Sequence, residues 1–259
     1  MMGSSPISLV GGFSSEVVRQ IGAGTSLIAQ ALGTLVRPPF VAPRLLLRQC
    51  AAIGVGSIPV VLITALFTGM VLALQSANAF ARFGAENLLG TVVSLSMVRE
   101  LGPVLTGLMV AGRSGSAMAA ELANMRITEQ IDALLTMATD PVRFLVLPRF
   151  LAAVIMMPCL VLFADLIGIV SGWLVAVRLL GNNPALYEHS ALQYLTMGDL
   201  TLSLVKAAVF GAILAAVSCY YGFYVKGGAR EVGVAVTRSV VISVIGILFF
   251  NYLLTAWLS

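Results

Sequence analysis

LSMVRELGPVLTGL, residues 95–108, places two charged residues and a proline inside an apolar run long enough to cross a membrane. Arg99 and Glu100 stand next to each other, and Pro103 follows three residues later. An ionisable residue at the centre of a bilayer costs about 2.5–3.5 kcal/mol on insertion scales, so it normally faces a cavity, a partner or another helix. This stretch therefore predicts a membrane-spanning helix whose charged residues serve binding or packing.

The composition of the whole chain indicates an integral membrane protein. Of its 259 residues, 59% are hydrophobic and only 10% are charged, whereas a soluble domain carries about 25% charged residues. The formal net charge of +4 is too small and too dispersed to indicate a nucleic-acid binder. The three cysteines, Cys50, Cys159 and Cys219, have neither metal-ligand spacing nor a disulfide pattern, so we expect no metal site.

Five apolar stretches each reach the roughly 20 residues that a helix needs to cross the hydrocarbon core. We predict spans at about 51–80, 88–112, 148–177, 200–225 and 237–258. Residues 16–32 are only moderately apolar and have a helical period, which favours an interfacial helix on the membrane surface. The sequence thus predicts an all-α integral membrane protein with an N-terminal interfacial helix region over residues 1–50 and one five-span domain over residues 51–259.

The basic residues predict how the chain is oriented. If the N-terminus is cytoplasmic, the outer side holds only Arg82 and Arg178. The inner side then holds Arg19, Arg37, Arg44, Arg48, Arg113, Arg126, Arg143, Arg149, Lys226, Arg230 and Arg238. Basic residues gather on the cytoplasmic side of membrane proteins, so we place the N-terminus inside and, after five spans, the C-terminus outside. In the outer loop at 178–199, NPALYEHSALQYL favours a brief surface helix.

Arg99, Glu100 and Lys206 carry the charges left inside the predicted membrane. At 1.5 Å per residue, the first two lie about 15 Å from the outer end of their span, and Lys206 lies about 9 Å from the outer end of its own. Neighbouring residues point about 100° apart on a helix, so Arg99 and Glu100 cannot fully pair with each other. At least one of them needs a partner on another span, and we predict that this partner is Lys206. Pro103 also leaves the carbonyl of Arg99 without its helical donor.

These polar groups together predict a hydrated pocket. The alternative is a buried ion pair that only fixes the packing of the helices. Asp165, in the third span, has no identified partner. For this residue a packing contact and a position near the outer interface are equally compatible with the sequence.

The segment between spans two and three has the pattern of an amphipathic helix. Ile127, Ile131, Leu134 and Leu135 fall on one helical face. Thr128, Glu129 and Asp132 are typical of its start, and Asp140-Pro141 stops it. The charge distribution puts this helix on the cytoplasmic side. Such a helix is either an interfacial connector or the element that a transport ATPase grips, and periodicity alone leaves both open.

Neither a protease nor an ATPase site is predicted. Gly112-Arg113-Ser114-Gly115 matches the GxSG of intramembrane serine proteases, but that serine needs a base within hydrogen-bond reach. The one histidine, His189, lies in the outer loop, across the membrane. No GxxxxGK[ST] loop occurs, so the chain cannot bind and split ATP through a P-loop by itself, and we expect no cofactor.

The central block resembles a known family. LSMVRELGPVLTGLMVAGRSGSAMAAELANMRITEQIDAL at 95–134, followed by DPVRFLVLPRF at 140–150, is similar to the signature of the MlaE (YrbE) permeases. GMVLALQ at 69–75 and GGAREVGVAVTRSVV at 227–241 extend the resemblance. These permeases are the membrane subunits of ABC transporters that work with MCE proteins. The resemblance implies an N-terminal interfacial helix, five spans and a homodimer.

The same resemblance implies partners, a cargo and a location. It implies a cytoplasmic ABC ATPase, a STAS-domain protein bound to that ATPase, and a hexameric MCE ring on the periplasmic face. The assembly would move phospholipids between the inner and outer membranes of a Gram-negative bacterium and so maintain outer-membrane lipid asymmetry. The chain would then lie in the bacterial inner membrane, with its N-terminus cytoplasmic and its C-terminus periplasmic.

The resemblance also assigns site residues. It places a lipid pocket at the homodimer interface, lined by Arg99, Glu100, Lys206, Leu72, Phe80 and Phe83. Relatives can carry tyrosine where this chain has Phe83. The ATPase contact is assigned to the helix after span two, here about 124–137, and within it to Arg126, Glu129, Asp132 and Leu135.

Other functions remain open on the sequence. An ion-coupled carrier could use Glu100 and Asp165 as relay sites, and it would transport without an ATPase. A permease of the same family could carry another hydrophobic cargo, such as a sterol. A scaffold that anchors periplasmic proteins would not need its charges inside the membrane.

Overall fold

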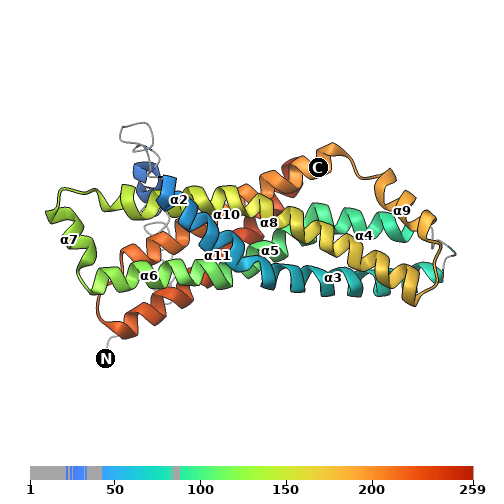
Figure 1. Cartoon of the computed structure of the whole chain (residues 1–259), viewed down its shortest axis with the longest axis horizontal. Helices are drawn as coiled ribbons and strands as arrows, with labels where there is room; N and C mark the ends of the chain where they lie inside the picture. Colours follow the sequence, from blue (N-terminus) through green and yellow to red (C-terminus); the bar gives the residue numbers. More distant parts are fainter. Residues whose placement is uncertain are drawn as a thin grey trace, which may run out of the picture.

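The computed structural model consists of helices and short connections over the residues that it describes, which are 22, 24, 26–31, 33, 43–82, 84 and 88–258. The α-helices are α2 (Pro43–Cys50), α3 (Gly56–Ala81), α4 (Leu89–Ser96), α5 (Gly102–Val110), α6 (Ser116–Ile127), α7 (Gln130–Thr136), α8 (Leu147–Leu174), α9 (Pro184–Gln193), α10 (Met197–Phe223) and α11 (Ala229–Leu258). The π-helical segments are η1 (Ala51–Val55), η3 (Met97–Leu101), η4 (Ala111–Gly115), η5 (Val142–Val146) and η6 (Val175–Leu179). The long helices run side by side, with α7 at one end of the molecule and α9 near the other (Figure 1).

Within the described residues, five helical runs are long and apolar enough to cross a membrane. They are Pro43–Ala81, Leu89–Ile127, Val142–Leu179, Met197–Phe223 and Ala229–Trp257. Each overlaps one of the spans predicted from the sequence, so the all-α, five-span fold class is confirmed. The first run begins at Pro43, so residue 50, the predicted boundary between two regions, lies inside a helix.

The second run is longer than the sequence predicted. It continues past residue 112 to Ile127, because α6 is rich in alanine, leucine and methionine, which are good helix formers. Its 39 residues extend about 58 Å, nearly twice the thickness of the hydrocarbon core. This helix therefore projects beyond the membrane and carries α7 away from it.

Three of the π-helical segments lie one turn before a proline. Each contains the residue four positions before a proline, and the pairs are Val55 and Pro59, Arg99 and Pro103, and Phe144 and Pro148. Proline has no N–H, so the carbonyl one turn earlier loses its helical donor. A wider π-turn accommodates the missing bond without ending the helix.

Small residues allow the spans to pack closely. A Cβ at Gly69 on α3 would collide with the carbonyl oxygen of Gly168 on α8, so the two backbones touch there. On α10, a Cβ at Gly211 would come within 2.6 Å of the carbonyl oxygen of Ala153 on α8. Such close approach is the usual basis of helix association in lipid, where apolar contact alone does not favour one neighbour over another.

The N-terminal segment joins the bundle at the α7 end. The described positions between 22 and 33 are helical, which agrees with the predicted helix, while residues 16–21 lie outside the described chain. Leu27 and Ala31 are fully buried in a cluster with Leu122 of α6 and Cys219 of α10. This helix therefore packs against protein along at least one face.

The loop after the third span contains the predicted short helix, α9. It begins at Asn183, whose side-chain oxygen accepts a hydrogen bond from the backbone N–H of Ala185 at 3.0 Å, as an N-cap does. Tyr187 and Ala191 are buried in a cluster with residues of α4, so α9 covers the end of the second span that α4 forms. Burial raises the pKa of the Tyr187 phenol above its ordinary value, so the group stays neutral at physiological pH.

Candidate functional site

Lys206 is the centre of a polar network in the membrane-spanning bundle. Its side chain is 0% exposed. The ammonium group donates to Oε1 of Glu100 at 2.8 Å, to the carbonyl oxygen of Arg99 at 2.7 Å and to Oγ1 of Thr255 at 2.8 Å. A lysine ammonium has three N–H donors, so all of them are used. The prediction that Lys206 partners one of the two neighbouring charged residues is confirmed, and that residue is Glu100. Lys206 also satisfies the carbonyl that Pro103 leaves without a donor.

Glu100 is held by the last turns of α11. Its Oε2 accepts a hydrogen bond from the Asn251 side chain at 2.9 Å, and its Oε1 lies 2.9 Å from Oγ1 of Thr255. Neither partner was predicted from the sequence. Asn251 and Thr255 are four residues apart in an otherwise apolar span, and this spacing puts two polar groups on one helix face.

Arg99 pairs with a carboxylate that was not predicted from the sequence. Its Nε lies 2.6 Å from Oδ1 of Asp199, near the start of α10. Asp199 also forms a capping box with Thr196: its Oδ2 accepts from the Thr196 N–H at 2.9 Å, and its own N–H donates to the Thr196 hydroxyl at 3.3 Å. The guanidinium of Arg99 is therefore fixed at the first turn of α10, towards the α9 end of the bundle.

In each of the two ion pairs, one charged side chain is buried and the other is partly exposed. The side chains of Lys206 and Asp199 are 0% and 6% exposed, whereas those of Glu100 and Arg99 are 39% and 48% exposed. The two cations and two carboxylates balance one another. In this arrangement Arg99 is the cation that a ligand can reach, because every donor of Lys206 already has an acceptor inside the protein.

Asp165 lies beside the network without joining it. The residue is buried, and its Oδ2 accepts a 3.3 Å hydrogen bond from Ser203, one turn before Lys206 on α10. Its Oδ1 has no hydrogen-bond partner among the described residues. A Cβ at Gly102 would collide with that oxygen, so Asp165 packs directly against the start of α5. Of the two possibilities left by the sequence, the structure supports a packing contact.

The apolar residues assigned to the pocket lie along α3. Leu72 and Phe80 are half-buried and pack, together with Leu101, against the buried cluster beneath α9. Leu101 follows Glu100 in the chain, so this apolar surface continues towards the polar network. Phe83 lies outside the described residues.

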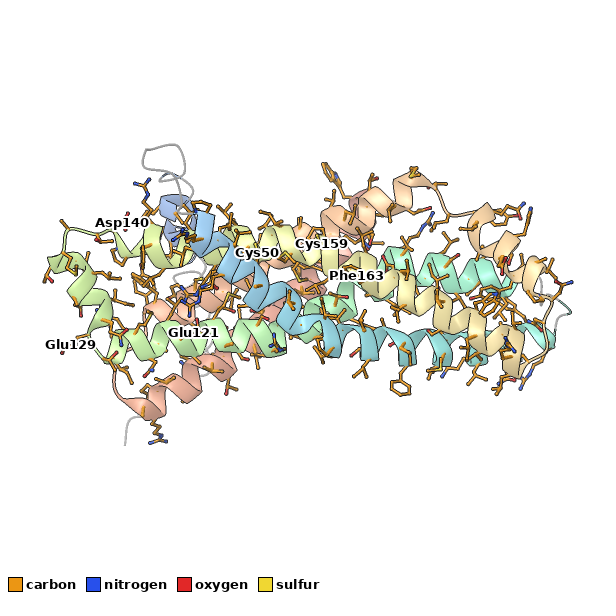
Figure 2. The ribbon with its side chains drawn as sticks, viewed as in Figure 1. Cys50, Glu121, Glu129, Asp140, Cys159 and Phe163 are labelled. Carbon is orange, nitrogen blue, oxygen red and sulfur yellow. The ribbon has the colours of Figure 1, made fainter. Side chains whose placement is uncertain are left out.

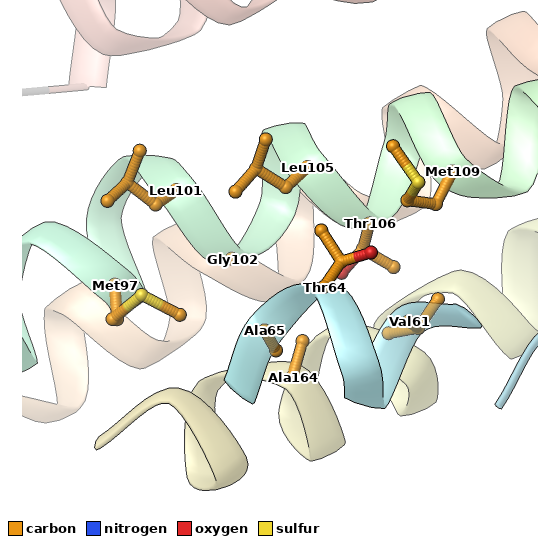
Figure 3. A pocket seen from close by; sticks show the side chains of 10 residues that line it. All are labelled: Val61, Thr64, Ala65, Met97, Leu101, Gly102, Leu105, Thr106, Met109 and Ala164. Atoms are coloured by element: carbon orange, nitrogen blue, oxygen red, sulfur yellow. The ribbon is translucent and has the colours of Figure 1, made fainter. Parts of the chain in front are cut away.

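A small hollow lies next to the network, between α3, α5 and α8 (Figure 3). Its volume is about 10 Å³, which is room for about one water molecule. Leu101 and Gly102 line it, together with the hydroxyl-bearing Thr64 and Thr106. Ligand pockets usually measure about 300–1,000 Å³. This hollow inside one chain is therefore far too small for a lipid tail.

The predicted cytoplasmic helix is interrupted by a turn. α6 ends at Ile127, and α7 begins at Gln130. Between them Glu129 has a left-handed backbone with φ of 60°. The predicted single helix over 124–137 is therefore wrong, because the apolar period continues across a turn that carries no glycine signal.

The four residues assigned to the ATPase contact lie around this turn. Arg126 of α6 and Asp132 of α7 form an exposed ion pair of 2.6 Å across it. Glu129 is exposed at the tip of the molecule (Figure 2). Leu135 is exposed on α7, whereas Ile131 is buried against the bundle. This end of the molecule thus exposes a charged turn and an apolar side chain.

The sequence of this chain is similar to that of known membrane transport proteins. Residues 46–257 match the family described as Permease MlaE. A probable ABC transporter permease protein of Rickettsia typhi is 49% identical over 248 residues, covering 96% of this chain and 95% of that protein. One from Synechocystis is 41% identical over 212 residues, covering 82% and 80%. The protein TRIGALACTOSYLDIACYLGLYCEROL 1, chloroplastic, of Arabidopsis thaliana is 36% identical over 211 residues, covering 82% and 60%.

Proposed function

Because the chain belongs to the MlaE permease family, we propose that it moves phospholipids between the inner and outer membranes and so maintains outer-membrane lipid asymmetry. The chain is an ABC transporter permease, a transport component without a catalytic site of its own, and this role implies an ABC ATPase as partner. The name of the Arabidopsis relative refers to a glycolipid, which supports a lipid cargo in general. Phospholipid is the cargo that best suits the polar network.

The half-exposed guanidinium of Arg99 is the observation that carries this proposal. A phospholipid needs an apolar slot for its tails and a cation for its phosphate. Asp199 accepts from Nε of Arg99, so the N–H groups of the two outer nitrogens are available to a phosphate. Lys206 and Glu100 then position the helix around Arg99, and Leu72, Phe80 and Phe83 line the tail slot.

The tail slot needs more space than the hollow that the described residues enclose next to the network. The hollow beside Leu101 holds about one water, and yet both α3 and α11 carry large exposed apolar side chains, such as Phe67 and Phe249. A two-fold dimer would face such surfaces towards each other and enclose a larger slot. We therefore include in the proposal a homodimer with the lipid pocket at its interface.

The remaining partners follow from the same proposal. The turn and α7, with Arg126, Glu129, Asp132 and Leu135, would contact the ATPase in the cytoplasm. A STAS-domain protein would bind that ATPase, and a hexameric MCE protein would sit on the periplasmic face. The chain would lie in the bacterial inner membrane, with its N-terminus cytoplasmic and its C-terminus periplasmic.

The test is lipid transfer by the reconstituted transporter. Arg99→Gln should abolish ATP-dependent transfer of a fluorescent phospholipid from proteoliposomes, because the phosphate loses its cation. Arg82→Gln removes an exposed arginine near the end of α3 and should leave transfer unchanged. Unchanged transfer in Arg99→Gln would contradict the pocket assignment.

The same assay separates the alternatives. An ion-coupled carrier using Glu100 and Asp165 would transport on an ion gradient in vesicles that lack the ATPase. A permease for another hydrophobic cargo, such as a sterol, would transfer that cargo equally well in Arg99→Gln and the parent protein. A scaffold would show no transfer of any lipid.

A further inference from the structure

A second hollow, of about 240 Å³, lies where α10 turns into α11. It is at the opposite end of α10 from the polar network, since Lys226 follows Lys206 by twenty residues, or about 30 Å of helix. The lining residues that matter here are Tyr220, Tyr221, Tyr224, Lys226, Glu231 and Arg238. None of them belongs to the site described above.

Tyrosine rings form one wall of this hollow. The ring of Tyr220 lies 5.3 Å from that of Tyr221 and 5.3 Å from that of Tyr224, at interplanar angles of 80° and 52°. Tyr224 is exposed. Below the rings, Val225 and Ala235 are buried against α6. The hollow therefore has an apolar floor and a fixed aromatic side.

Two cations face the tyrosines from different elements. Lys226 follows the end of α10, and Arg238 lies in the third turn of α11. Both are exposed, and neither forms an ion pair with a described residue. Glu231 lines the same hollow, so two cations oppose one carboxylate there. The net charge favours an anion.

The turn between the helices keeps this group of residues together. Gly227 has a φ of 116°, which side-chain-bearing residues rarely adopt. A Cβ at that position would also lie 2.8 Å from Cγ of Glu231. Glycine thus allows the chain to reverse tightly enough for Lys226 and Arg238 to line one hollow.

We propose that this hollow binds the phosphate of an anionic phospholipid head group from the membrane leaflet on its own side. Arg238 is the last charged residue of the chain, and the uncharged stretch 239–259 begins directly after it, so the hollow lies at the level of the membrane–water interface. Its volume is below the 300–1,000 Å³ that encloses a whole drug-sized ligand, which suits a head group with its tails left in the bilayer.

This contact is a second lipid site and does not depend on the function proposed for Arg99. By the distribution of basic residues it faces the cytoplasmic leaflet, where anionic lipids attract Lys and Arg near the surface. Tyrosine and cationic side chains also occur at membrane interfaces without binding any particular lipid. The experiment must therefore compare matched charges.

Native mass spectrometry of the purified full-length protein, titrated with dioleoyl phosphatidylglycerol, tests the proposal. The double variant Lys226→Gln and Arg238→Gln loses two interfacial cations, so its affinity for the lipid in the hollow should fall about thirtyfold. At lipid concentrations that fill this site in the parent, the variant should therefore carry one lipid fewer per chain. The matched control, Arg48→Gln with Arg230→Gln, removes two exposed arginines outside the hollow and should bind lipid as the parent does. Glu231→Gln should bind it more tightly, because the opposing carboxylate is gone.

The outcomes separate the possible sources of the phosphate and rule out misfolding. A gain of affinity in Glu231→Gln supports the site, because misfolding cannot strengthen binding. Equal losses in the double variant and the control would overturn it, since the cations would then act only through overall charge. Inorganic phosphate is titrated in the same way. If it binds in place of the lipid, the site is one for a free ion and the proposal is overturned.

Discussion

Replacing Lys206 with methionine gives the most direct test of the buried network. The change keeps the length and apolar stem of the side chain but removes the ammonium, which is 0% exposed. The carbonyl of Arg99 and an oxygen of Glu100 each lose a donor at 2.7–2.8 Å. Thr255 loses a third contact.

The size of the effect follows from these contacts. Removing one partner of a buried ion pair costs roughly 3–5 kcal/mol, because the other charge stays buried and unpaired. Glu100 is 39% exposed and keeps its bonds to Asn251 and Thr255, so we expect the low end, about 3 kcal/mol. For a chain of this length that is a fall in Tm of roughly 6–12 °C.

A double-mutant cycle tests whether Lys206 and Glu100 stabilise the bundle as a pair. Lys206→Met, Glu100→Gln and their combination would be compared in thermal unfolding of the protein in mild detergent. Because the double variant leaves no buried charge unpaired, it should lose about 1–3 kcal/mol less than the sum of the single variants. Arg178→Met, at an exposed position, controls for loss of a cation. Additive losses, or a single loss below about 0.5 kcal/mol, would show that the pair does not stabilise the bundle.

Three further predictions address neighbouring features. Asp199→Asn removes the anchor of Arg99 and weakens the cap of α10, so we expect a loss of about 1–2 kcal/mol in thermal unfolding, together with slower phospholipid transfer; unchanged values in both assays would contradict the anchoring role. Glu129→Gly should raise stability by up to about 1 kcal/mol, because glycine adopts the left-handed backbone without strain; a fall in Tm would refute this. Gly102→Ala should cost roughly 1–3 kcal/mol through its collision with Asp165, and Asp165→Ala in the same chain should restore most of the loss; failure of that rescue would place the collision elsewhere.

The sequence was sufficient for the features that follow from local chemistry. A charge in a membrane span needs a partner, and a proline deprives a known carbonyl of its donor. The sequence therefore predicted a partner for one of the charges and an unmet need at the Arg99 carbonyl, but not that Lys206 meets both. The spans could be predicted because only a long apolar helix fits the bilayer. None of these inferences needed the relative rotation of the helices.

The contacts that were missed do depend on that rotation. Asp199, Asn251 and Thr255 lie 100 or more residues from Arg99 and Glu100, and the sequence does not tell which faces of α10 and α11 turn inward. The break at Glu129 was missed for a different reason, since a left-handed turn normally carries a glycine or asparagine. Its apolar period continues from Ile127 to Ile131 as if the helix did not end.

The π-turn at η3 determines which way the two membrane charges point. A π-turn holds one surplus residue, and one residue of an α-helix corresponds to about 100° of rotation. Without the surplus, α4 would be rotated by roughly that angle relative to the part of the span that follows Pro103. In a chain one residue shorter there, either α4 could pack against α9 or Glu100 could contact Lys206, but both contacts could not form together.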